Sequence, residues 1–366
     1  MNVESLSLDG FRNLEGVNIE PAPGVNIIYG KNAQGKTNLL EGLWLFTGGK
    51  SFRGAKDAET VGFGREFAEL EMGFFSQGRK QSAVIRIKDA REAKLNGVPL
   101  ASPGRLAGEF CAVVFSPAHL SLVKDGPAAR RRFMDAALCQ LRPRYMSDLG
   151  GYNRALKQRS ALLRDLKYHG ELLDTLELWE AQLAALGARI SDLRARYIKK
   201  LEPAARQVFD GLSGGSEELG LKYSRPAGKE LCDGRDQWES SLREELLKAR
   251  KDDIFTGRTS VGPHRDDLDI GINGISARIF GSQGQQRSCV LALKLSEATV
   301  LRETTGEQPV ALLDDVMSEL DSGRQDYILN HIDGWQVFVT CCEPSSVLNL
   351  HGGRAFEMRG GKIIDS

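Results

Sequence analysis

Residues 30–37 read Gly-Lys-Asn-Ala-Gln-Gly-Lys-Thr, which matches the G-x-x-x-x-G-K-[ST] pattern of a phosphate-binding loop. An apolar run, Val25–Tyr29, precedes this pattern, and a helix-like stretch, Asn38–Phe46, follows it. Strand, loop and helix in this order form the setting in which backbone N–H groups cradle phosphates. We expect Lys36 to reach the β- and γ-phosphates of a nucleotide and the Thr37 hydroxyl to ligate Mg²⁺.

A second part of the same site stands far along the chain, at Val310-Ala-Leu-Leu-Asp-Asp315. A buried strand that ends in acids aims a carboxylate at a metal beside the phosphate loop. Asp314 is the candidate ligand of Mg²⁺, directly or through water, and Asp315 is the candidate base or water-positioning residue for attack on the γ-phosphate. Because the two parts lie roughly 280 residues apart, we expect an α/β core made from both chain ends, with an insertion between them.

The middle of the chain has a different period from its ends. From Pro127 onward the pattern is helical, and apolar residues recur at three- and four-residue spacing between Leu172 and Tyr197. We expect three helices here, the first two separated at Gly150-Gly151. Strand character returns from Val261 and continues to Phe280.

Composition limits the class of protein. The 366 residues are 41% hydrophobic and 27% charged, as in an ordinary globular protein. No apolar run approaches the ~20 residues needed to span a bilayer, and the six cysteines have no metal-binding spacing. We therefore expect a cytoplasmic protein with no membrane association. The net charge of zero argues against a surface uniformly coated in basic residues.

Ser282-Gln-Gly-Gln-Gln-Arg287 begins another predicted helix. A serine and a glycine at a helix N-terminus provide free N–H groups, a positive dipole end and a hydroxyl for an anion. A simple serine N-cap explains the same residues. The segment stands about thirty residues before the Asp314-Asp315 strand, which is the spacing in ABC-type ATPases, where the serine contacts a γ-phosphate bound to a second subunit.

These motifs together resemble the RecF family of recombination-mediator ATPases, which are related to the heads of SMC and double-strand-break repair ATPases. The resemblance covers essentially the whole chain. The segments that carry it are Gly10-Phe-Arg-Asn-Leu14, Gly30–Thr37, Phe115-Ser-Pro117, Leu122-Val-Lys124, Arg130-Arg-Arg-Phe133, Gly262-Pro-His-Arg-Asp-Asp-Leu268, Ser282–Arg287, Leu312-Leu-Asp-Asp315 and Ser318-Glu-Leu-Asp321.

The resemblance implies an ABC/SMC-type P-loop ATPase head, formed by residues 1–125 and 255–366, and a mainly helical arm, residues 126–254. Two ATP molecules would lie between the heads of a homodimer, with Ser318–Asp321 crossing the interface. Lys36, Asp314 and Asp315 would be catalytic, and Thr37 and Asp314 would hold Mg²⁺. The residues expected to contact or lie near ATP are Arg12, Asn13, Gly30, Lys31, Asn32, Ala33, Gln34, Gly35, Lys36, Thr37, Asn38, Ser282, Gln283 and Gly284.

The same resemblance implies a weak, DNA-stimulated ATPase. Its task would be to bind duplex DNA at single-strand gaps and, with RecR and RecO, to help load recombinase during recombinational repair, replication restart and the SOS response to DNA damage.

Two other classes of protein remain open. One is the ATPase subunit of a transporter, and the other is a nucleotide-gated scaffold that does not hydrolyse ATP, since Asp315 is shorter than the glutamate common at that position.

Basic residues gather in the arm. They form either solvated helix faces or a surface for sequence-independent phosphate contacts. The family resemblance favours the DNA interpretation for the set as a whole, but not for any one residue. The set is Arg130, Arg131, Arg132, Arg142, Arg144, Arg154, Lys157, Arg159, Arg164, Lys167, Arg194, Arg196, Lys199 and Lys200.

The chain departs from the family pattern at two places and from the pattern of transporter ATPases at a third. Ala118-His119 stands where the family usually has Glu-Asp, and Phe52 stands where a histidine is common. Thr340-Cys-Cys-Glu343 lacks the switch histidine of transporter ATPases, a histidine that RecF proteins also lack. The change at Ala118-His119 leaves open how the core is coupled to the arm.

Overall fold

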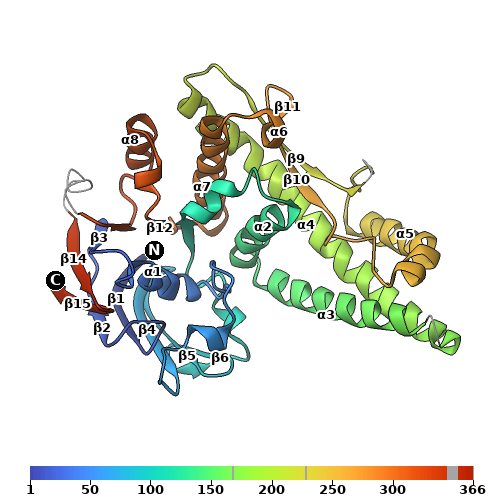
Figure 1. Ribbon diagram of the computed structural model, residues 1–366, viewed down its shortest axis with the longest axis horizontal. Coiled ribbons are helices and arrows are strands. Elements are labelled where there is room, and N and C mark those ends of the chain that lie inside the picture. The colour runs from blue at the N-terminus through green and yellow to red at the C-terminus, as the bar shows by residue number, and fades with distance from the viewer. Residues whose placement is uncertain (167–168, 227–228, 344–352, 366) are drawn as a thin grey trace.

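The computed structural model describes residues 1–166, 169–226, 229–343 and 353–365. A head built from both chain ends stands at one side of the molecule, and a helical arm extends from it (Figure 1). Within the described residues, the head contains two six-stranded sheets, and a three-stranded sheet packs against the longest helix of the arm. Lys167, one of the predicted basic residues of the arm, lies outside the described residues.

The central sheet of the head is mostly parallel and has the strand order β15-β14-β3-β13-β12-β8. Its middle strands are buried on both faces, as expected for parallel strands with near-continuous apolar runs. Strands from the first third and the last quarter of the chain are neighbours in it, so the prediction of a core made from both ends is confirmed. The strands are β3 (Val25–Tyr29), β8 (Ala112–Phe115), β12 (Val310–Asp314), β13 (Val337–Cys341), β14 (Arg354–Arg359) and β15 (Lys362–Asp365).

The second sheet of the head is antiparallel, and helix α1 (Lys36–Leu45) packs between it and the parallel sheet. Its longer strands alternate between buried and exposed residues, which is the pattern of a sheet with one face toward a core. Leu39, Leu40 and Leu43 of α1 join one cluster with residues of both sheets, and this packing fixes the start of the helix. The strands are β1 (Asn2–Asp9), β2 (Val17–Ile19), β4 (Ala68–Ser76), β5 (Arg79–Ile87), β6 (Arg91–Leu95) and β7 (Val98–Pro99).

The arm is organised around one long helix, α4, which packs against α3, α5 and α7. Its apolar stripe follows the spacing seen in the sequence, and Leu176, Leu183, Ile190 and Tyr197 are buried. The predicted boundary at residue 254 falls inside α5, so the exact residue bounds of head and arm stay a prediction. The remaining elements are α2 (Pro127–Leu141), α3 (Pro143–Asp165), α4 (Leu173–Ser213), β9 (Leu219–Ser224), α5 (Arg235–Thr256), β10 (Asp267–Ile272), β11 (Ile275–Ser276), α6 (Ala277–Phe280), α7 (Gln283–Thr305) and α8 (Ser322–His331).

Two local predictions are wrong. Helices α2 and α3 separate at Arg142, not at Gly150-Gly151, because Pro143 disfavours a helical conformation for the residue before it, and Arg142 is extended. The two glycines stay within α3, where Gly151 lies so close to α4 that an added Cβ would come within 3.2 Å of Leu186 Cδ1. Residues 277–280 form a helical turn in place of the predicted strand.

Three arginines of the predicted basic set are buried ion-pair partners. Arg130, Arg159 and Arg194 are 3%, 0% and 2% exposed. Arg130 Nη2 lies 2.8 Å from Asp267 Oδ2, and Arg194 Nη2 lies 2.8 Å from Asp135 Oδ1. Buried guanidinium groups are unreachable by a DNA phosphate, so these three residues are not part of a DNA-contacting surface.

Arg159→Met is expected to destabilise the arm. Arg159 pairs with Glu180 at 2.8 Å and with Asp253 at 2.7 Å, and all three side chains are buried. Removal of the arginine leaves buried carboxylates short of a partner, which costs about 3–5 kcal/mol. Urea unfolding measures the loss. Arg154→Met, an exposed change on the same helix, is the matched control and should shift stability by no more than ~0.5 kcal/mol.

Candidate nucleotide-binding site

The glycines of the loop occupy positions that no other residue fits. Gly30 has φ 148° and Gly35 has φ 114°, in the region that favours glycine. A Cβ on Gly30 would lie 2.3 Å from Met358 O of β14, and one on Gly35 would lie 2.8 Å from Leu14 Cδ2. The loop therefore passes between β14 and the turn at Phe11–Leu14 and has a single backbone path available.

The start of α1 can bind an anion through the ammonium group of Lys36 and the first backbone N–H groups of the helix. Lys36 Nζ donates to Gly30 O at 2.6 Å and to Lys31 O at 3.0 Å, so its ammonium group lies across the loop. No side chain caps the helix, and its first turn contains no acid. The first N–H groups of a helix have no intrahelical acceptor. These features fit a nucleotide phosphate.

The register of the parallel sheet brings the acidic strand to the loop. Asp314 pairs with Thr340, which pairs in turn with Ile28, two residues before the loop. Across a sequence separation of 277, Thr37 Oγ1 donates to Asp314 Oδ1 at 2.8 Å. The pKa of Asp314 is raised above its usual value, chiefly because the carboxyl is buried and also because Asp315 lies beside it; hydrogen bonds from Thr37 and Thr340 and the charge of Arg53 partly offset this. A hydroxyl and a carboxylate form an all-oxygen donor set that fits Mg²⁺. Asp315 follows directly and has φ 51°.

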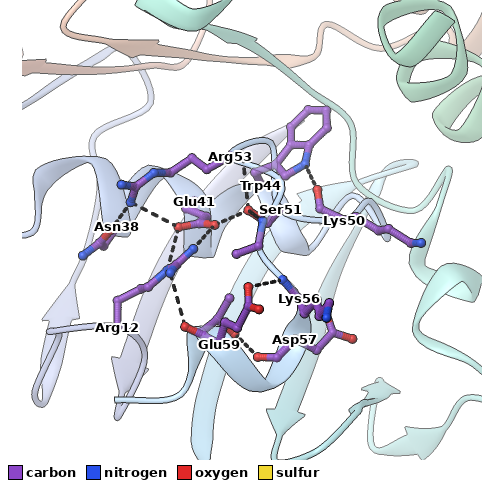
Figure 2. Close-up of polar contacts among 12 residues, drawn as sticks. Arg12, Asn38, Glu41, Trp44, Lys50, Ser51, Arg53, Lys56, Asp57 and Glu59 are labelled. Carbon is purple, nitrogen blue, oxygen red and sulfur yellow. Dashed lines mark hydrogen bonds and ion pairs between the residues drawn. The ribbon is translucent and has the colours of Figure 1, made fainter. Parts of the chain in front are cut away.

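Arg12 and Asn13 have different surroundings. Asn13 lies at the loop, where its Oδ1 accepts from Asn38 Nδ2 at 2.7 Å. The guanidinium of Arg12 donates instead to the two carboxylate oxygens of Glu41 at 3.1 and 2.9 Å (Figure 2). Arg12 is thus held against the side of α1, one turn along the helix from Thr37.

Glu41, Ser51 and Arg53 were missed in the sequence. Glu41 is fully buried in α1, and Figure 2 shows Arg12, Ser51 and Arg53 converging on its carboxylate. Ser51 Oγ donates to Glu41 Oε1 at 2.5 Å, and Arg53 Nη1 donates to Asn38 Oδ1 at 2.8 Å. A single acid inside the apolar run Leu39-Leu-Glu-Gly-Leu43 was the available signal. The cluster ties the segment after α1 to the residues beside Thr37.

The Ser282 segment is the N-cap of α7. Ser282 Oγ accepts from Gln285 N at 3.2 Å, and Gln285 Oε1 accepts from Ser282 N at 2.7 Å, which forms a capping box. Arg324 Nη2 donates to Gly284 O at 3.0 Å, and Arg287 Nη1 donates to Glu319 O at 2.6 Å. Figure 1 shows α6, and with it the start of α7, well apart from α1. The fold thus brings Asp314 to the loop within one chain, but not Ser282, Gln283 or Gly284.

Comparison with known proteins identifies the family. A family model described as an AAA domain matches residues 5–113. The DNA replication and repair protein RecF of Acetivibrio thermocellus is 39% identical over 355 residues, which cover 96% of each chain. That of Caldanaerobacter subterraneus is 39% identical over 373 residues and 100% of each chain. The chain belongs to the RecF family.

Solved structures agree with this assignment. A structure of the recombination mediator protein RecF with ATP, in the RecFOR pathway, has a TM-score of 0.91 and 38% identity, covering 99% of this chain and 96% of that one. An SMC head domain from Pyrococcus furiosus has a TM-score of 0.54 at 16% identity, covering 99% and 96%, and shares the fold alone. The predicted ABC/SMC-type head with a helical arm is therefore confirmed.

The short helical segment Pro117–Ser121, which contains the expected departure from the family pattern at Ala118-His119, lies against α7. His119 Nδ1 lies 3.2 Å from Ser116 Oγ. Burial, together with the positive charge of Lys294, lowers the pKa of His119 to about 3, so the ring is neutral at physiological pH. Lys294 forms its ion pair with Glu297 of the same helix. A neutral ring therefore packs beside α7 at the point where the departure occurs.

Among the described residues, every helix is too short or too polar to cross a bilayer.

Proposed function

We propose that this RecF-family protein binds ATP with Mg²⁺ and dimerises around two ATP molecules. In that state it binds duplex DNA at single-strand gaps, and with RecR and RecO it helps to load recombinase. The observation that supports the dimer most directly is that the expected nucleotide-binding residues lie in two separate places on one chain. The loop and Asp314 meet within one chain, whereas Ser282 caps a helix elsewhere on it. A second copy can supply Ser282, Gln283 and Gly284 to the γ-phosphate.

The residues of the loop divide the work of hydrolysis. Backbone N–H groups at the start of α1 and the ammonium of Lys36 hold the phosphates and stabilise charge on them. Thr37 and Asp314 would hold Mg²⁺, which would supply positive charge to neutralise the phosphates. Asp315 orients the attacking water and accepts its proton. The rate is expected to be low, with stimulation by DNA.

A basic stripe on α3 is our candidate for the DNA-binding surface of the arm. It consists of Arg154, Lys157 and Arg164, which lie on one side of the helix and are exposed. None of the three forms an ion pair with a described residue, and residues 149–164 contain no acid. Unpaired cations on a rigid helix fit phosphates without selecting a base sequence.

Binding to a gapped duplex, titrated over salt with and without ATP, tests the function. The variant with Arg154, Lys157 and Arg164 all changed to Gln should bind more weakly. The slope of log affinity against log salt should fall by up to about 3 per chain, since each lost phosphate contact removes about 0.9. A matched control changes Arg196, Arg243 and Lys248 to Gln. These arm residues are also exposed but are paired with Asp192, Glu239 and Glu244.

The outcomes separate the alternatives. ATP-dependent binding that the stripe variant loses and the control keeps supports the proposal. An equal loss of DNA affinity in both variants would mean that the arm attracts DNA through its overall positive charge and not through contacts of the stripe. Absence of DNA binding at low salt would contradict the function itself.

A further inference from the structure

The hydroxyl of Thr340 contacts both acids of the site, although no motif singled it out. Thr340 is the fourth residue of β13 and is 2% exposed. Its Oγ1 donates to Asp314 Oδ1 at 3.1 Å and accepts from the backbone N–H of Asp315 at 2.9 Å. One hydroxyl therefore uses its proton on the first acid and a lone pair on the second.

The effect on Asp314 is to fix which carboxylate oxygen stays free. Thr37 and Thr340 both donate to Oδ1. Oδ2 takes no hydrogen bond from any residue in the described ranges. With Oδ1 held from two sides the carboxylate has one orientation, and Oδ2 remains for a metal or a metal-bound water.

The effect on Asp315 is to hold its backbone. Its φ of 51° lies in the left-handed region, which residues other than glycine seldom adopt. Thr340 accepts from its N–H, and Ser318 Oγ donates to its carbonyl at 2.9 Å. Both peptide groups that flank Asp315 are thus fixed by hydroxyls, and its side chain leaves the backbone in a defined direction.

We propose that Thr340 is a positioning residue for hydrolysis, which orients Asp314 and Asp315 together without touching nucleotide. This inference rests on the proposed ATP hydrolysis. Valine has the same shape as threonine but can neither donate to Asp314 nor accept from Asp315. Serine keeps both functions.

The test compares Thr340→Val and Thr340→Ser by steady-state hydrolysis over a range of ATP and Mg²⁺ concentrations. Thr340→Val should lower kcat about 10- to 100-fold, the scale of effect of a small displacement of catalytic groups. Its KM for ATP should stay within about threefold, since the phosphate contacts are intact, and the Mg²⁺ concentration for half-maximal rate should rise. Thr340→Ser should restore most of kcat.

Two further variants exclude a loss of folding. Thr340→Ala is a second hydroxyl-free variant, and melting temperature is measured for each protein. Ser76→Ala removes another buried hydroxyl, which donates to Glu109 O and Glu307 Oε2 at the opposite end of the same parallel strands. It should leave kcat and the Mg²⁺ requirement unchanged.

The possible failures are distinct. Wild-type protein that does not hydrolyse ATP would overturn the proposed function and this inference with it. Wild-type hydrolysis that Thr340→Val and Thr340→Ala retain would overturn the inference alone. A loss in kcat that serine fails to restore, or one that tracks melting temperature, would reduce Thr340 to a structural residue.

Discussion

Lys36→Ala is expected to abolish nucleotide binding at ordinary ATP concentrations, and with it dimerisation and ATP-dependent DNA binding. The ammonium of Lys36 now donates to Gly30 O and Lys31 O, and in a complex it would donate to phosphate oxygens. Each hydrogen bond to a charged group contributes about 1.5–3 kcal/mol. Loss of two such bonds weakens binding by at least about 100-fold, which titration calorimetry with ATP and Mg²⁺ measures.

Lys31→Ala is the matched control for this variant. Lys31 is in the same loop but its side chain is exposed, and the loop uses its backbone. We expect ATP affinity to stay within about threefold of wild type, because the phosphate-facing N–H groups remain. If the two variants bind ATP equally well, the loop is not the phosphate site, and the proposed nucleotide site of the head is wrong.

The elements that form the nucleotide site were predictable from the sequence because their chemistry is local. An apolar strand, a glycine loop and a helix follow one another over Val25–Leu45, and backbone geometry alone creates the anion site. Asp314 was predictable for a similar reason, since it ends a run of apolar residues that can only be a buried strand. The parallel register then places the two segments side by side.

The functional assignment of the arginines could not be read from local sequence. Arg159 and Asp253 are 94 residues apart, and Arg130 and Asp267 are 137 apart. A window around either arginine shows only a basic helix, so burial becomes visible when the tertiary partner is placed. Arg12 and Glu41 present the same difficulty at a separation of 29. The sequence around Ser282 also fits two interpretations, an N-cap and an anion site. A capped helix is compatible with both, so the local sequence does not distinguish them.

Asp315→Asn is expected to stop hydrolysis while ATP binding continues, which should trap the ATP-bound dimer. Asparagine keeps the size of the side chain and tolerates the left-handed backbone that Asp315 adopts. It cannot accept a proton from the attacking water. Loss of a general base typically costs about 10²- to 10⁴-fold in rate. Single-turnover hydrolysis measures the chemical step, and light scattering with and without ATP measures the dimer.

Asp333→Asn serves as the control because it makes the same change in charge at an exposed turn after α8. It should hydrolyse ATP at the wild-type rate and dissociate after turnover. In the proposed dimer, the γ-phosphate bound to the loop of one chain also contacts Ser282 of the other. Only a triphosphate can therefore hold the two chains together. A dimer of Asp315→Asn that forms with ATP and is absent with ADP would therefore support the clamp.

Three results would contradict this scheme, each at a different step. If Asp315→Asn hydrolyses ATP at the wild-type rate in a single turnover, Asp315 is not the general base and another residue must accept the proton. Absence of hydrolysis in the wild type, with ATP-dependent dimers in both proteins, would favour the scaffold that only binds nucleotide. A monomeric Asp315→Asn protein with ATP bound would contradict the proposed dimer. A single chain would then hold ATP without contact from Ser282 of a second copy.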